Sequence, residues 1–124
     1  MDSLKEALKT SQKTKITCQE AHEMAERFNI SPLDLGRLLD ELQIKIIGCQ
    51  LGLFGYGEKK KDIPQITSPD PDIVDAIKAS VKGNKISCKT AWEIADGRKI
   101  QRKMVAGHIE SLGIKITDCQ LGAF

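Results

Sequence analysis

The sequence lacks the features that mark several large classes of protein. No stretch approaches the roughly 18 consecutive apolar residues of a membrane span. The beginning, Met1–Glu6, has no basic and apolar secretory leader. No phosphate-binding glycine loop is found, and no set of nucleophile, base and orienting residue. We therefore expect a cytoplasmic protein that is not an enzyme, needs no cofactor and does not bind a membrane.

Closely spaced cysteine pairs are also missing. The four cysteines, Cys18, Cys49, Cys88 and Cys119, leave 30 residues between the two members of each pair, whereas structural zinc sites usually show Cys-x2-4-Cys. We interpret them as small buried thiols and not as metal ligands. A cysteine-based metal or redox site stays open as an alternative, because Cys18 and Cys88 at helix N-termini would have some thiolate character if exposed.

What the chain does contain is an internal duplication. Residues 15–54 align with residues 85–124 at an offset of 70 without gaps, and 16 of the 40 positions are identical. Each copy closes with Cys-Gln-Leu-Gly-x-Phe, at residues 49–54 and 119–124, which we name the closing segments. We expect two domains of this kind, repeat 1 at residues 1–55 and repeat 2 at 71–124, joined by a linker at 56–70.

The two repeats differ in charge. Repeat 1 has 7 Lys and Arg against 8 Asp and Glu, the linker 3 against 3, and repeat 2 has 9 against 6. The net charges are therefore −1, 0 and +3. Because the repeats share a scaffold but present different surfaces, this divergence bears on function more than the total charge of +2 does.

The periodicity predicts mainly helices with small β hairpins. Apolar residues at helical spacing predict helices at residues 2–12 and 73–81, and a capping box of Thr17 and Glu20 predicts a helix that starts at Cys18. Ser31 and Pro32 predict the start of another helix. The alternation in Ile44–Ile46 predicts a strand, and Gly48 with Gly52 permits a hairpin whose apolar residues, up to Phe54 and Phe124, cover the helices of the same repeat.

Two helices joined by a tight turn form the central pattern of each repeat. A small residue, an apolar plug in the turn and two further apolar positions recur at equal spacing: Ala25, Ile30, Leu35 and Leu38, then Ala95, Ile100, Val105 and His108. The whole unit resembles the winged-helix branch of the helix-turn-helix superfamily. That resemblance covers nearly all of both copies. It implies nucleic-acid binding, with the second helix of the pair entering the major groove.

Repeat 2 carries the side chains suited to this activity. Cations and an amide gather at the turn and the first turn of the second helix, and the hairpin adds one lysine; the expected DNA-binding residues are Arg98, Lys99, Gln101, Arg102, Lys103 and Lys115. In repeat 1 the same face has Asp34 and Asp40, which would oppose phosphates. We therefore expect a small transcriptional regulator that binds double-stranded DNA mainly through repeat 2.

Two other interpretations remain. The basic cluster could be an ordinary solvated face. Alternatively the chain could be an adaptor that binds another protein through repeat 1, with Leu33 as an exposed apolar anchor and Arg37 beside it. The histidines do not indicate a duplicated or catalytic site, since His108 replaces a core leucine and His22 occupies the position that Trp92 holds in repeat 2.

Overall fold

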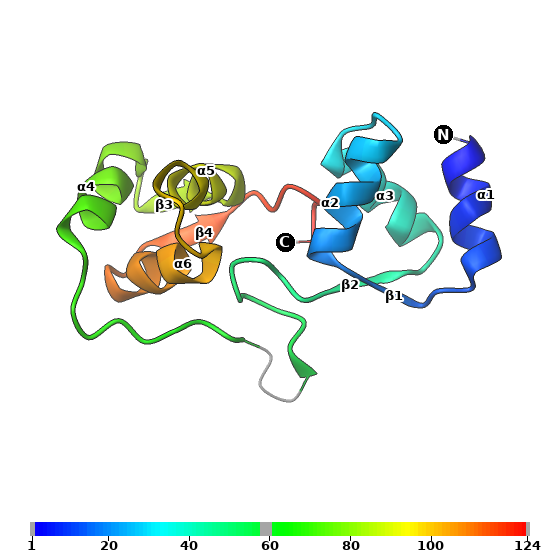
Figure 1. Cartoon of the computed structure of the whole chain (residues 1–124). Coiled ribbons are helices and arrows are strands. Elements are labelled where there is room, and N and C mark those ends of the chain that lie inside the picture. Colours follow the sequence, from blue (N-terminus) through cyan, green and yellow to red (C-terminus); the bar gives the residue numbers. More distant parts are fainter. Residues whose placement is uncertain (1, 58–60, 124) are drawn as a thin grey trace.

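The computed structural model describes residues 2–57 and 61–123 and is mainly helical, with short strands (Figure 1). The same order of elements, helix, strand, helix, helix and strand, occurs twice. In repeat 1 these are α1 (Asp2–Ser11), β1 (Lys15–Thr17), α2 (Cys18–Arg27), α3 (Pro32–Glu41) and β2 (Lys45–Ile47). In repeat 2 they are α4 (Pro71–Ser80), β3 (Lys85–Ser87), α5 (Cys88–Arg98), α6 (Arg102–Ser111) and β4 (Lys115–Thr117).

Side-chain caps start most of these helices. The Thr17 hydroxyl accepts a hydrogen bond from the Glu20 backbone N–H at 3.1 Å, and the Glu20 carboxylate accepts one from the Thr17 N–H, which completes the expected capping box. Ser31 and Asp70 cap α3 and α4, each followed by proline at the first helical position. In contrast, α6 follows Gln101, which makes no side-chain capping bond.

The turn between the paired helices has the same geometry in both repeats. Asn29 and Lys99 both adopt left-handed backbone conformations, with φ of 54° and 55°. In each repeat the apolar plug then donates a 3.0 Å backbone hydrogen bond to the alanine five residues earlier, from Ile30 to Ala25 and from Ile100 to Ala95. Lysine is a less favourable residue than asparagine in this conformation, yet the turn is the same.

The strands of each repeat do not form the β hairpins that were expected from the sequence. The strands of each repeat pair in parallel, β1 with β2 and β3 with β4, in two-stranded sheets. The physical reason is the connection: two helices separate the paired strands, which lets the chain return in the same direction, whereas a hairpin joins antiparallel neighbours. The glycine turn follows β2, where Cys49 N–H donates to Phe54 C=O at 3.1 Å and closes a small loop.

The closing segments do not complete the repeats that they belong to. Leu121 is buried in the core of repeat 1 among residues of α1, α2 and α3, while Leu51 is buried in the core of repeat 2 among residues of α4, α5 and α6. Figure 1 shows the C-terminal segment leaving β4 and reaching α2 and α3. Our expectation that each segment covers its own helices is therefore wrong for Leu51 and Leu121. Phe54 packs on the repeat 2 core, and Phe124 lies outside the described residues.

Two glycines permit close backbone contacts, one with the closing segment of repeat 2 and one with the linker. A Cβ atom at Gly36 in α3 would lie 1.7 Å from the Leu121 carbonyl oxygen, so only glycine lets the closing segment of repeat 2 approach. A Cβ atom at Gly107 in α6 would lie 2.6 Å from the Pro64 carbonyl oxygen. The residues between the repeats therefore run along α6.

Candidate functional site

The residues expected to bind DNA fall into two groups. Arg98, Lys99, Gln101 and Lys115 are exposed to solvent. Arg102 and Lys103 are only partly exposed, with 27% and 32% of their side-chain surface accessible, because both contact other parts of the chain. The structure therefore leaves the first group available to a partner and commits the second to intramolecular contacts.

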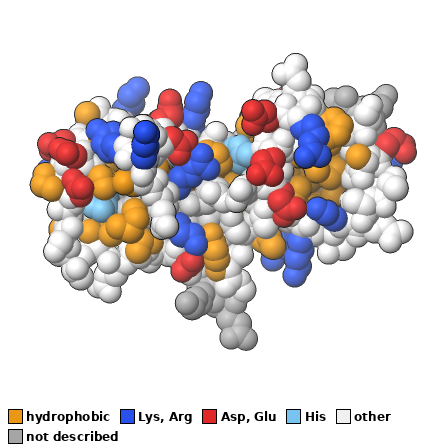
Figure 2. All heavy atoms as spheres, in the orientation of Figure 1, with side chains coloured by type: hydrophobic (Ala, Val, Ile, Leu, Met, Phe, Trp, Pro, Cys, Tyr) orange, Lys and Arg blue, Asp and Glu red, His pale blue; other side chains and the backbone are white. Residues whose placement is uncertain are grey.

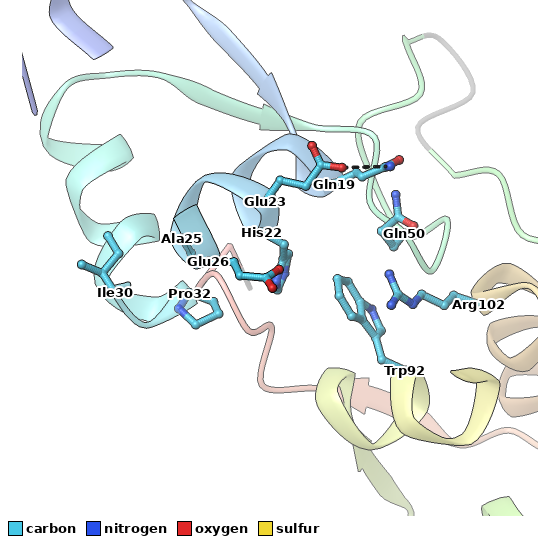
Figure 3. A pocket seen from close by; sticks show the side chains of 10 residues that line it. All are labelled: Gln19, His22, Glu23, Ala25, Glu26, Ile30, Pro32, Gln50, Trp92 and Arg102. Carbon is cyan, nitrogen blue, oxygen red and sulfur yellow. Dashed lines mark hydrogen bonds between the residues drawn. The ribbon is translucent and has the colours of Figure 1, made fainter. Parts of the chain in front are cut away.

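Arg102 binds within the junction between the repeats. Its guanidinium makes two hydrogen bonds to the Asp96 carboxylate, at 3.1 and 2.9 Å, and lies 3.7 Å from the centroid of the Trp92 ring. Figure 3 shows Arg102 and His22 on opposite sides of Trp92. The Nε1 atom of Trp92 is buried without a hydrogen-bond partner among the described residues. Bidentate pairing and stacking are the two interactions that hold an arginine most firmly, so this side chain is not free to read a base.

Lys103 is held by the linker. Its ammonium donates to the Asp62 carboxylate at 2.5 Å and lies 4.4 Å from the centroid of the Tyr56 ring. The hydrogen bond to Asp62 raises the pKa of Lys103 above its ordinary value. Lys103 therefore fastens the segment between the repeats to α6.

Most of α6 is covered. Val105, Ala106, Gly107, His108 and Ile109 are all buried, which leaves no continuous exposed face along this helix. His108 joins α6 to the start of α4, since its Nε2 accepts from the Asp70 N–H at 3.0 Å. A helix buried on so many sides cannot lie lengthwise in a major groove, so only its N-terminal end can approach DNA.

An unexpected cluster of lysines lies where β3 and β4 begin. Lys85 and Lys115 are direct neighbours on β3 and β4, and Lys82 is bridged to Lys85. We name Lys82, Lys85 and Lys115 the lysine edge; all three are exposed, and none pairs with a described carboxylate. Of these three lysines, only Lys115 is among the residues expected from the sequence to bind DNA. The missed signal is the Lys-Ile dipeptide that opens both strands of both repeats.

The two residues expected to bind a protein partner are placed differently from each other. Leu33 is 42% exposed, but its Cδ1 atom would lie 2.9 Å from a Cβ atom at Gly122, so it contacts the closing segment of repeat 2. Arg37 is 73% exposed and makes a long ion pair of 3.9 Å with Asp34. Leu33 is therefore partly used inside the chain.

The junction also holds a cavity with an acidic wall. Its volume is about 530 Å³, and Glu23 and Glu26 of α2 line it together with the stacked His22, Trp92 and Arg102 (Figure 3). Burial and the charge of Arg102 lower the pKa of His22 to about 4, so the imidazole is neutral near pH 7. An acidic opening disfavours phosphate groups, which places any nucleic-acid contact outside this cavity.

The four cysteines converge at the same junction. Cys18 and Cys88 begin α2 and α5, whereas Cys49 and Cys119 begin the closing segments. Cys18, Cys49 and Cys88 are buried, and Cys119 is half-buried. Cys49 lies in the core that contains Cys88, and Cys119 packs against the core that contains Cys18.

Burial determines the acidity of these thiols. It raises the pKa of Cys18 to about 12 and also raises the pKa values of Cys49 and Cys88. Repulsion from the other cysteine thiolates raises these three pKa values further, by less than burial does. Within residues 2–57 and 61–123, no three His, Cys, Asp or Glu side chains are grouped tightly enough to hold a single metal ion.

Comparison with known proteins does not add to this description. No family model, no curated protein and no solved structure matches the chain. No helix in the described part of the chain is both long enough and apolar enough to cross a membrane. The function must therefore be inferred from the surfaces described above.

Proposed function

We propose that the chain is a DNA-binding protein, a small transcriptional regulator built from two helix-turn-helix units. The helix pairs α2–α3 and α5–α6 supply the two units, and the identical hydrogen bonds at Ile30 and Ile100 support the assignment. Parallel strand pairs stand where a winged helix would have a hairpin. The proposal therefore concerns a helix-turn-helix core with an altered β element.

The observation that carries the proposal is the lysine edge. Like charges on neighbouring strands repel each other, and no described carboxylate offsets the repulsion at Lys85 and Lys115. Repeat 1 has the same pair, Lys15 beside Lys45. A duplicated, unpaired and exposed pair of ammonium groups is suited to phosphates, because lysine acts as a point charge toward them.

The mode of binding differs from the one expected from the sequence. Arg102 and Lys103 are engaged within the chain and α6 is largely covered, so base readout along a recognition helix is not supported. Arg98, Lys99 and Gln101 remain exposed at the N-terminal end of α6. We therefore propose that repeat 2 binds mainly the phosphate backbone, with weak sequence preference.

The visible charge distribution limits the strength of this binding. On the face in Figure 2, Lys and Arg side chains are interspersed with Asp and Glu, and they do not form one continuous basic surface. A protein of this kind gains its affinity from a few phosphate contacts. Affinity should consequently fall with salt along a shallow slope.

The test is a titration of the full chain against a random-sequence DNA duplex at several salt concentrations. Replacing Lys85 and Lys115 by glutamate should weaken binding at low salt at least tenfold. The slope of log affinity against log salt should become shallower by about 1.8, because two phosphate contacts are lost. Unchanged affinity and slope in this variant would overturn the proposal.

A matched control uses two other exposed lysines of repeat 2. Lys78 lies in α4 and Lys89 in α5, and their replacement by glutamate changes the net charge of the chain by the same amount. This control should reduce affinity less than threefold, since the reduction comes only from long-range electrostatics. Equal losses in both variants would show that net charge, and not the lysine edge, governs binding.

The adaptor alternative has weaker support. Leu33 contacts the closing segment of repeat 2 and is thus partly satisfied inside the chain. The remaining exposed large apolar side chain among those described is Met104, in the other repeat. Two separated apolar side chains are ordinary for a protein surface and do not define a docking site.

A further inference from the structure

The two repeats differ at one equivalent place, where the end of the first paired helix faces the start of the second. In repeat 2 an arginine fills this place. Arg102, the first residue of α6, donates two hydrogen bonds to Asp96, at 3.1 and 2.9 Å, and lies 3.7 Å from the centroid of the Trp92 ring. Paired hydrogen bonds to a carboxylate and contact with an aromatic ring are the means by which proteins hold a guanidinium. Repeat 2 therefore shows which chemical group fits this place.

Repeat 1 keeps a carboxylate and an aromatic ring at this place but has no arginine. The counterparts at the offset of 70 residues are Glu26 for Asp96, His22 for Trp92 and Pro32 for Arg102. Pro32 is the first residue of α3, as Arg102 is of α6, so the backbone positions correspond. Repeat 1 thus presents the residue types that bind a guanidinium, with an uncharged side chain at the position of the arginine.

The cavity of about 530 Å³ lies at this place in repeat 1, since Glu26, His22 and Pro32 all line it. In Figure 3, Glu26 and Pro32 lie on one side of His22 and Trp92 lies on the other. In repeat 2, Arg102 and His22 lie on opposite sides of Trp92. The counterparts therefore follow the same order around the two rings that touch. The volume falls within the range of about 300–1,000 Å³ that is typical of sites for small ligands.

The charges around the cavity favour a cation. Glu23 and Glu26 line it, both are exposed, and neither forms an ion pair with a described cation. The charge of Arg102 is offset by its ion pair with Asp96. Because His22 is neutral near pH 7, it does not repel a cation either. Two carboxylates without a balancing charge therefore remain in the wall of the cavity.

We infer that this cavity binds the guanidinium group of an arginine supplied from outside the chain. Glu26 pairs with the guanidinium as Asp96 pairs with Arg102, and His22 provides the ring against which it lies. The arginine can be a free amino acid or part of an exposed peptide segment of another protein, since both present the same group. The site does not depend on DNA binding, because it lies outside the lysine edge.

The experiment titrates the full chain with acetyl-Gly-Arg-Gly-amide and follows the fluorescence of Trp92, which is the only tryptophan of the chain and lines the cavity. We expect saturable binding, at least about threefold tighter than that of acetyl-Gly-Lys-Gly-amide, because an ammonium cannot form two parallel hydrogen bonds to a carboxylate. Equal affinity of the arginine and lysine peptides, or no saturable binding of an arginine compound, would overturn the inference.

A parallel titration with free arginine identifies the source of the group. The glutamates repel the carboxylate of free arginine, so an arginine within a peptide should bind more tightly if the site serves a protein segment. Affinity for free arginine equal to or above that for the peptide would assign the site to a small molecule. Both results support a guanidinium site.

A matched pair of variants tests the carboxylate. Glu26→Gln keeps the size of the side chain and should weaken binding of the arginine peptide at least about fivefold, because the charged partner is lost. Glu6→Gln removes an exposed carboxylate of α1 that does not line the cavity, and should change the affinity less than about twofold. Both positions are exposed, so both variants should fold. Equal affinities of the two variants would contradict the role of Glu26.

A further variant transfers the arrangement of repeat 2 into repeat 1. Pro32→Arg places a guanidinium at the position equivalent to Arg102, where it can pair with Glu26 inside the chain. Binding of the arginine peptide should weaken at least about tenfold, because an intramolecular group competes at high effective concentration. Pro32→Ala removes the same proline without adding a cation, and should keep the affinity within about twofold. Undiminished binding in Pro32→Arg would contradict the correspondence between the two places.

The outcome is distinguishable from that of the DNA experiment. The variant with glutamate at Lys85 and Lys115 should still bind the arginine peptide, because neither lysine lines the cavity. Loss of DNA binding with retained peptide binding would support both ideas. A chain that binds DNA but not the arginine peptide would leave the proposed function standing and remove the guanidinium site.

Discussion

His22 packs against Trp92, the residue that holds the equivalent position in the other repeat. Their ring centroids are 4.3 Å apart and their planes are inclined by 44°. Equivalent residues touch only where two copies face each other, so this pair lies in the junction between the repeats. The arrangement is reciprocal, since Leu51 and Leu121, also 70 positions apart, each enter the core of the opposite repeat.

The exchange of closing segments predicts an effect that crosses between repeats. Leu121→Ala removes a fully buried side chain from the core of repeat 1 and should lower the free energy of unfolding by about 2–5 kcal/mol. Hydrogen exchange should speed up more in α2 and α3 than in α5 and α6. Leu51→Ala should show the opposite distribution. Faster hydrogen exchange confined to the repeat that carries the substitution would contradict the crossing of the closing segments.

Two glycines in helices provide a matched pair for the close contact at α3. Gly36→Ala puts a Cβ atom 1.7 Å from a backbone oxygen that cannot move independently, and should lower the free energy of unfolding by about 2 kcal/mol or more despite the better helix propensity of alanine. Gly97→Ala in α5 meets nothing within 4 Å and should raise stability by about 0.5–1 kcal/mol. Urea unfolding measures both. Equal effects of the two substitutions would refute the close approach of Leu121.

The half-buried His22 predicts a loss of stability in mild acid. The folded chain holds the pKa of His22 at about 4, whereas the unfolded value is about 6.5, so the unfolded chain binds more protons between these values. The contribution of His22 is therefore complete above pH 6.5 and declines as the pH falls toward 4. Because the ring is only partly buried, the loss should be on the order of 1–2 kcal/mol.

The control for this effect is His22→Phe, which keeps an aromatic ring against Trp92 without a titrating group. Unfolding free energies of both proteins, measured from pH 7 to pH 4, should diverge as the pH falls, with the wild type losing more. Parallel curves would mean that the His22 ring titrates normally in the folded chain, which would place it outside the half-buried position against Trp92.

Much of the local structure follows from the sequence because it depends on neighbouring residues. Thr17 and Glu20 specify the start of α2 through two short-range hydrogen bonds. Asn29 tolerates the left-handed turn that separates α2 from α3. The burial of Leu35 and Leu39 follows from helical spacing alone. Lys99 is an exception in which the packing of Ile100 imposes a conformation that its own residue type disfavours.

The candidate sites depend on contacts between distant residues. The sequence position of Arg102 predicts a groove-binding residue. In the structure, however, its guanidinium is hydrogen-bonded to Asp96 and lies against the Trp92 ring. Lys85 becomes part of a candidate phosphate-binding pair only because β4 places Lys115 beside it. Such pairings arise from how the chain returns on itself. No periodicity within a single segment contains that information.

The closing segments show most clearly which features follow from the sequence and which depend on the tertiary structure. The sequence by itself determined that the chain is duplicated, that its helices are capped and paired, and that Cys49 and Cys119 occupy equivalent places. Only the tertiary structure decided that each leucine crosses to the other repeat, and that Cys49 lies in the core of repeat 2 while Cys119 packs against the core of repeat 1. The physical reason is that a buried apolar side chain is stabilised equally by either of two similar cores. Which core each leucine enters depends on the path of the chain after β2 and β4, and only the tertiary structure contains that path.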